Sequence, residues 1–135
     1  MIEQGIYALL VAATGVSSVI SDRLYPLVLP EDLVSANDAL PASATYQLVS
    51  AIPDYTNDGA TGLQRSRIRY TGIGSVYSDA ASVAAAIRVV LENYAGTLAD
   101  GTVVSNVLVA NQSSTYSDDA RLYFVAYDFL IFYAN

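Results

Sequence analysis

Residues 78–94, SDAASVAAAIRVVLENY, constrain the fold most because they carry the clearest helical periodicity in the chain. Their apolar residues recur at the spacing of a single stripe along a helix, namely Val83, Ala84, Ile87, Val90, Leu91 and Tyr94. Ser78 is expected to cap the start of this helix, and Gly96 is expected to stop it. The stripe is rich in alanine, which allows another element to approach closely, and strand-like segments lie on both sides of it in the sequence. We therefore expect this helix to lie across a sheet.

The flanking segments predict an α+β fold in one domain covering residues 1–135. A second helix is indicated over residues 2–13, with Gly15 as its stop and a turn over residues 16–21. The expected strands are residues 23–29, an edge strand interrupted by Pro26, then 44–52, 63–73, 102–110 and 121–133. The order α-β-β-β-α-β-β predicts a mainly antiparallel, mixed sheet of four to five strands, with the two main helices packed on one face.

Two loops complete this outline. Residues 31–42 mix acids, Asn and Pro and are expected to form a mobile loop. Residues 53–62 contain the turn dipeptide Asp58-Gly59, so 44–52 and 63–73 are expected to form a hairpin with a long tip. Residues 111–119 are expected to be a polar loop leading into the last strand.

The absent residue types exclude most catalytic chemistry. The chain has no Cys, no His and no Lys, and its six basic residues are all Arg. Thiolate nucleophiles, imidazole bases, Schiff bases, P-loops and most transition-metal sites are therefore not expected. The net charge of −7 also argues against a protein that grips nucleic acid. We expect no enzyme activity, no cofactor and no metal.

The composition points to protein partners instead. Hydrophobic residues make up 53% of the chain and charged residues only 14%, yet no segment offers the apolar run that a membrane span needs. Glu3 stands where a signal peptide would be basic, so we expect an intracellular protein that covers its surplus apolar surface with other protein.

Two short motifs resemble ligand sites and fail in detail. Residues 54–59 resemble a calcium loop, but Thr56 stands at a ligand position and Arg65 stands where a bidentate Glu is needed, so a polar hairpin tip is favoured. Gly72 and Gly74 resemble a dinucleotide fingerprint, but Tyr77 fills the place of its third glycine. The favoured interpretation is that both glycines relax the turn from strand to helix.

Arg65, Arg67 and Arg69 alternate along one expected strand, so their side chains should share one face. Three interpretations are open: a nucleic-acid contact, a solvated face, and ion pairs with acids of a neighbouring chain. The third is favoured because Arg suits interface ion pairs. Asp118 and Asp119 are candidate partners, and their polar setting gives no reason to expect acid–base catalysis.

Asp128 is the only residue of LYFVAYDFLIFY that is not apolar. It is expected either to be a buried partner for an Arg, which we favour, or to fix the strand register against a neighbour. Both faces of this strand are hydrophobic and need cover, so part of it, including Tyr127 and Phe129, is expected to touch a neighbouring subunit.

From end to end the chain resembles the tail-completion, or tail-terminator, proteins at the neck of long-tailed bacteriophages. The segments that carry the resemblance are GIYALL, DRLYPLVLP, LPASATYQLVS, DYTNDGATGLQRSRIRY, YSDAASVAAAIRVVLENYAGTL and YSDDARLYFVAYDFLIFY. The stretch RSRIRYTGIGS departs from the family pattern, because it is more basic and has more glycines than the usual apolar run.

The resemblance implies a structural virion protein, made in the host cytoplasm, that forms a ring of itself, typically of six. Such a ring caps the tail tube and joins it to the head connector or stopper protein, while DNA passes through its lumen without specific binding. On this basis we expect subunit contacts at Arg65, Arg67, Arg69, Asp118, Asp119, Tyr127, Asp128 and Phe129. Lumen or axial-partner loops are expected at Glu31, Asp32, Asp38, Asp54 and Asp58. The alternative is a small, non-catalytic intracellular adaptor or binding module that acts as a monomer or dimer.

Overall fold

The computed structural model describes residues 2–20, 23–27, 42–56, 59–99, 101–118 and 121–134, with the backbone alone for residues 52–56 and 59–63. The helices are α1 (Ile2–Ala12), α2 (Thr14–Ile20) and α4 (Tyr77–Leu91). The strands are β1 (Leu24–Pro26), β2 (Ser43–Thr56), β3 (Gly59–Gly74), β4 (Gly96–Thr97), β5 (Val103–Ser117) and β6 (Leu122–Ala134).

Within these residues the strands form one six-stranded mixed sheet in the order β1-β2-β3-β6-β5-β4. β1 pairs with β2 in parallel, and all other neighbours are antiparallel. The predicted α+β class, the mixed and mainly antiparallel sheet, the hairpin of β2 and β3 and the edge position of β1 are confirmed. The predicted number of four to five strands and the predicted order of elements are wrong, because α2 and β4 were missed.

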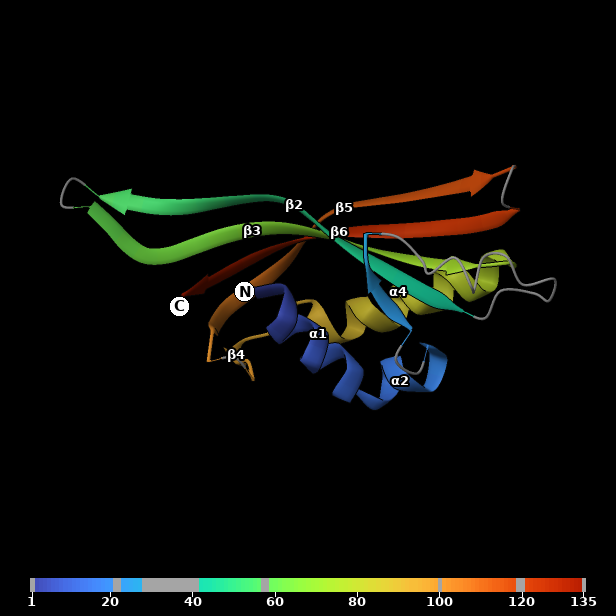
Figure 1. Ribbon diagram of the computed structural model, residues 1–135, viewed down its shortest axis with the longest axis horizontal. Helices are drawn as coiled ribbons and strands as arrows, with labels where there is room; N and C mark the ends of the chain where they lie inside the picture. The colour runs from blue at the N-terminus through green and yellow to red at the C-terminus, as the bar shows by residue number, and fades with distance from the viewer. Residues whose placement is uncertain are drawn as a thin grey trace.

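The described helices α1, α2 and α4 all lie on one side of the sheet, as Figure 1 shows, and this confirms that the main helices pack on one face. The alternation of buried side chains gives the same answer, since Ile68 and Tyr70 of β3 and Phe129 and Ile131 of β6 belong to the core under the helices. We call this side of the sheet the helix face and the opposite side the open face.

Helix α4 confirms the predicted helix and its stripe. Its buried residues are Ala80, Val83, Ala84, Ile87 and Leu91, and it packs across β3 and β6. The predicted caps are wrong: the N-cap position is Val76, and it makes no side-chain cap hydrogen bond. The helix ends at Leu91, before the expected stop at Gly96, and Asn93 takes a left-handed conformation (φ 63°) two residues after its end.

Gly72 and Gly74 lie in β3 under the first turns of α4. A Cβ atom at Gly72 would stand 2.4 Å from the backbone oxygen of Ala80, and one at Gly74 would stand 2.7 Å from the Cβ of Asp79. The two glycines therefore allow close packing of helix on strand. This corrects their interpretation as residues that relax the turn into the helix.

The N-terminal region contains two helices where one was predicted. Gly15 lies inside α2 and does not stop the first helix, and the expected turn over residues 16–21 is helical up to Ile20. Glycine and β-branched residues form helices poorly, so the sequence pattern was weak here. Val16 and Ile20 are nevertheless buried in the core, and α2 packs against α4. Tertiary packing thus stabilises this helix.

The strands run well beyond their predicted ends. β2 and β3 extend to Thr56 and Gly59, so they cover most of the expected long tip of the hairpin. β5 continues to Ser117, through the segment predicted to be a polar loop. It pairs there with β6, for example Gln112 with Tyr127 and Thr115 with Phe124. Cross-strand pairing with an apolar strand has overridden the low strand preference of this polar segment.

In the described part of the chain no single helix is long and apolar enough to cross a membrane. α1 and α2 reach the length and apolar character of a membrane span only when they are counted together, and the chain bends by 84° at their junction.

Candidate interaction surface

The sheet register places four polar or charged residues in one row across the open face. Arg69 of β3 is opposite Gln47 of β2 on one side and Asp128 of β6 on the other, and Asp128 is opposite Asn111 of β5. Residues that are directly opposite each other in a sheet point to the same face, so the row is a continuous polar strip. The predicted sharing of one face by the alternating arginines follows from the same register.

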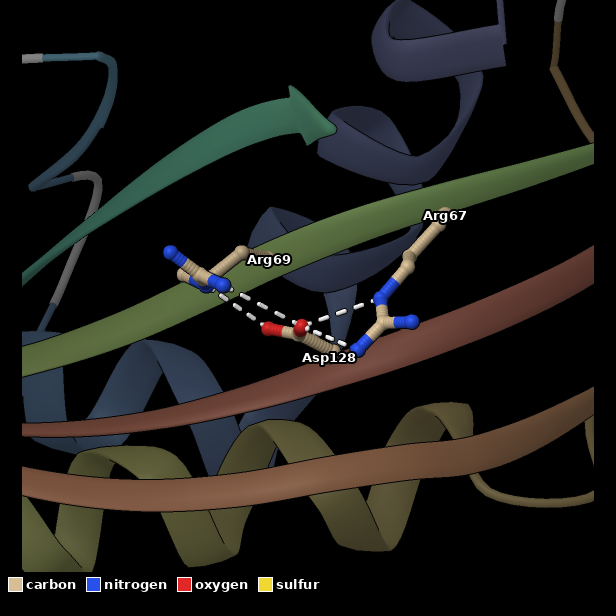
Figure 2. A network of polar contacts seen from close by, with 3 residues as sticks. All are labelled: Arg67, Arg69 and Asp128. Carbon is tan, nitrogen blue, oxygen red and sulfur yellow. Dashed lines mark hydrogen bonds and ion pairs between the residues drawn. The ribbon is translucent and has the colours of Figure 1, made fainter. Parts of the chain in front are cut away.

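Two guanidinium groups converge on one carboxylate in this strip, as Figure 2 shows. The Nε and Nη2 atoms of Arg67 donate to Oδ2 of Asp128 at 3.0 and 2.9 Å. The Nε atom of Arg69 donates to Oδ1 at 2.7 Å, and its Nη2 atom donates to Oδ2 at 3.3 Å. Both carboxylate oxygens are thus satisfied. The favoured prediction, that Asp128 is a buried partner for an Arg, is confirmed, and two half-exposed arginines share it.

The cluster of Arg67, Arg69 and Asp128 has two positive groups and one negative group, so it carries a net charge of +1. Asp128 is only 2% exposed, whereas the side chains of Arg67 and Arg69 are 38% and 42% exposed. Burial by itself would raise the pKa of Asp128, but hydrogen bonds from Arg69 and Arg67 outweigh it and hold this pKa below its ordinary value. The hydrogen bond to Asp128 raises the pKa of Arg69 in turn. Asp128 and Arg69 are therefore charged at neutral pH.

Two of the three arginines have a partner within their own chain, and the predicted ion pair with a neighbouring chain stays a prediction. The acid that pairs with Arg67 and Arg69 belongs to the same chain and comes from the next strand of the same sheet. Arg65 differs from the other two, because its side chain is exposed and no ion pair or side-chain hydrogen bond is found for it among the described residues. It is the arginine of β3 that is free to meet another molecule.

Apolar side chains flank the polar strip on the open face. Leu130 of β6 is opposite Arg67 on one side and Leu108 of β5 on the other, and Phe132 is opposite Arg65. Leu108 is 42% exposed, and Val103, in the same strand, is 49% exposed. Exposed apolar residues clustered around a charged group are typical of surfaces that meet other proteins.

The sequence pattern missed the part that Leu108 and Leu130 play in this surface. Leu108 lies in an alternating segment, and Leu130 lies in the apolar strand, so both could have been assigned to one face or the other. What could not be known was that β5 and β6 are neighbours and that the helices cover the opposite side.

The structure separates the other predicted interface residues. Phe129 is fully buried and Tyr127 is 8% exposed, and both belong to the core on the helix face. They serve their own chain, so we leave them out of the proposed interface. Asp118 is exposed in the turn after β5. Asp119 lies outside the described residues.

Most of the residues predicted for the lumen or axial-partner loops lie outside the described part of the chain. Glu31, Asp32, Asp38 and Asp58 lie outside the described residues, and so does most of the expected loop over residues 31–42. The backbone of Asp54 lies in β2, and nothing is described of its side chain. Among the residues that are described, no group of three or more His, Cys, Asp or Glu could hold a metal ion.

Comparison with known proteins identifies the family. The family model described as Tail completion protein gp17 matches residues 4–134, which is nearly the whole chain. The chain belongs to the tail completion protein gp17 family. This confirms the resemblance drawn from the sequence and makes the protein a structural component of a phage-type tail, and thus of a virion.

A solved structure has the same fold. A chain from the "Virion of native gene transfer agent (GTA) particle" superposes with a TM-score of 0.75 at 13% sequence identity, covering 96% of this chain and 92% of the other. At this identity the likeness establishes the shared fold. A search of curated proteins finds no match.

Proposed function

We propose that this tail completion protein is a non-enzymatic structural protein that assembles with copies of itself into a ring at the end of the tail. Its family, Tail completion protein gp17, supports a place in the tail. The ring, with six subunits expected from the family resemblance, would cap the tail tube and join it to the head connector or stopper protein. DNA would pass through the lumen without specific binding.

The observation that carries the proposal is the open face of the sheet. One side of the sheet is covered by three helices, and the other presents Leu108, Leu130 and Phe132 beside the cluster of Arg67, Arg69 and Asp128. A two-layer domain normally buries the apolar side chains of its sheet against a second layer. We propose that a neighbouring subunit forms part of such a second layer over the open face.

The charge of the chain supports both parts of the proposal. The protein carries a net charge of −7, so a neighbouring copy can supply acids to the exposed Arg65 and to the excess positive charge on the open face. Asp118 and Asp119 stay candidates for this role. The same negative charge would repel the phosphate backbone of DNA, and a lumen that does not bind DNA would let the genome pass.

The test measures the mass of the purified protein in solution, alone and with tail tube protein, and looks for rings by electron microscopy. Two substitutions probe the open face: Arg65→Glu, which breaks no ion pair among the described residues, and Leu108→Glu, on a side chain that is already 42% exposed. Val89→Glu is the matched control, because Val89 is 82% exposed on α4, on the opposite side of the sheet.

The expected result is that the parent and Val89→Glu assemble, whereas both open-face variants assemble at least tenfold less at equal concentration. Circular dichroism and thermal unfolding should show all four proteins folded. A parent protein that stays monomeric with and without tube protein, at every concentration, would refute the ring. That outcome would favour the adaptor alternative.

A further inference from the structure

Besides its open face, the sheet has an edge at β5, where no described strand pairs with most of the outer side of this strand. β4 covers β5 only at Val103 and Val104, and the backbone N–H of Asn93 donates to the carbonyl oxygen of Val107 at 2.9 Å. From residue 108 to residue 116 no described strand pairs with the outer side of β5. Among the described strands, these nine residues are thus paired on one side only.

This edge has one of the features that usually prevent strand addition, a β-bulge, and lacks the others. Natural edge strands are protected by Lys, by Pro, by an inward-pointing charge, by β-bulges or by being short. Residues 108–116, LVANQSSTY, contain no charged residue and no proline. One irregularity of register between Val109 and Asn111 interrupts the strand, and beyond it the pairing with β6 is regular up to Ser117. The remaining run from Asn111 is long enough to accept another strand.

The opposite side of the sheet offers a strand that matches. β1 covers β2 only at residues 44–46, and the N–H of Leu27 donates to the carbonyl oxygen of Tyr46 at 2.9 Å. From residue 47 to residue 52, QLVSAI, no described strand pairs with the outer side of β2, and this segment too contains no charge and no proline. Leu48 and Val49 are 38% and 42% exposed there.

The strand directions allow these two edges to meet. β2 is antiparallel to β3, β3 to β6 and β6 to β5, so β2 and β5 run in opposite directions within one chain. A second copy placed beside the first, with its sheet in the same orientation and shifted along the strands so that its β1 clears residues 112–114, would therefore bring its β2 antiparallel to β5. Antiparallel pairing is commoner than parallel pairing in sheets, and here it continues the alternation of strand direction from β2 through β3 and β6 to β5.

We propose that residues 108–116 of one copy accept residues 47–52 of a second copy as an additional antiparallel strand. This inference rests on the proposed self-assembly and names the strands that meet. The contact joins two different edges of identical chains, so it is head-to-tail and repeats from copy to copy. Such a contact closes into a ring when the rotation between copies divides a full turn, and the donor and acceptor are main-chain groups that need no charged partner.

Cross-linking tests this arrangement cleanly because the natural chain has no cysteine. Ser50→Cys on β2 and Ser113→Cys on β5 are made as separate single variants. Ser50 is opposite Arg67 and Ser113 is opposite Ala126, so both side chains lie on the open face. Opposed residues in paired strands have Cβ atoms about 4.5–5.5 Å apart, within reach of a short bifunctional thiol reagent. Asn111→Cys and Thr115→Cys are used in place of Ser113→Cys in parallel samples. The register between β2 of one copy and β5 of the next decides which of these three residues is opposite Ser50.

The expected result is that an equal mixture of the β2 and β5 variants, under conditions in which the parent assembles, yields cross-linked dimers at one of the three β5 positions. Each variant alone should yield less than a tenth as much. Ser82→Cys, on the exposed side of α4, is the control and should not cross-link to Ser50→Cys.

Three outcomes would overturn the inference. Cross-linking of a β5 variant with itself at the level of the mixture would show that two β5 edges meet across a two-fold axis. An assembled sample with no cross-link at any of the three positions would exclude the edge contact and leave the ring standing. A parent that remains monomeric with tube protein would remove both the edge contact and the proposed ring.

Discussion

Replacing Asp128 with Asn tests whether the charge of this residue holds β3 and β6 together. The substitution keeps the shape of the side chain but removes its charge, and it turns one acceptor oxygen into an N–H donor that faces the N–H groups of Arg67 and Arg69. A hydrogen bond to a charged group contributes about 1.5–3 kcal/mol. Because the two arginine side chains are 38% and 42% exposed, water can replace part of what they lose. We therefore expect a loss of about 2 kcal/mol in the free energy of unfolding.

The assay is thermal unfolding followed by circular dichroism. An unfolding entropy of about 2.1 cal/mol/K per residue gives about 0.28 kcal/mol/K for a chain of this length, so 2 kcal/mol corresponds to about 7 °C in Tm. Asp118→Asn is the control, because Asp118 is exposed in the turn after β5, and it should change Tm by less than about 2 °C.

The pH dependence of Tm shows whether the loss of stability in Asp128→Asn comes from the missing charge or from a change in the shape of the side chain. The pKa of Asp128 is lowered in the folded protein from its ordinary value of 3.8, so its contribution is present above that value and is lost as the pH falls through the lowered pKa. The gap in Tm between the parent and Asp128→Asn should therefore be full at about pH 7 and should narrow below about pH 4. Equal Tm values at neutral pH, or a gap that does not change with pH, would refute the argument.

Two further predictions concern the packing of the helix face. Gly72→Ala should lower the stability by about 3 kcal/mol, or about 10 °C in Tm, because its Cβ atom would stand 2.4 Å from the backbone oxygen of Ala80, which cannot move without shifting α4. Gly15→Ala is the matched control: nothing lies within 4 Å of its Cβ position inside α2, so Tm should rise by about 2–3 °C, and a fall in Tm would contradict this account of the two glycines. Tyr133→Phe should cost about 1–2 kcal/mol in urea unfolding, because it removes two hydrogen bonds of the Tyr133 hydroxyl, the one that it donates to Oε1 of Gln64 and the buried one with the Ser66 hydroxyl, each 2.8 Å long. An unchanged urea midpoint would show that these hydrogen bonds do not contribute.

Local pattern predicted the elements whose own residues carry a strong periodicity. The stripe of α4 and the hairpin of β2 and β3 were found because the spacing of apolar residues and the turn dipeptide are properties of neighbouring residues. The same holds for the common face of Arg65, Arg67 and Arg69. Local pattern failed for α2, which contains Gly15 and β-branched residues, and for residues 111–117 of β5, which are polar throughout. Both are stabilised by contacts with residues far away in the sequence.

The sequence by itself determined that this chain is a single α+β domain of a recognisable tail completion family, with no Cys, His or Lys for catalysis and with Asp128 alone in an apolar strand. Only the tertiary structure decided that β6 lies between β3 and β5, so that Asp128 meets Arg67 and Arg69 of its own chain. It also decided which side of the sheet the described helices cover, and along which stretches of β2 and β5 no described strand pairs with the outer side. The physical reason is that periodicity is local, whereas strand order and register depend on pairing between distant segments, which no short stretch of sequence encodes.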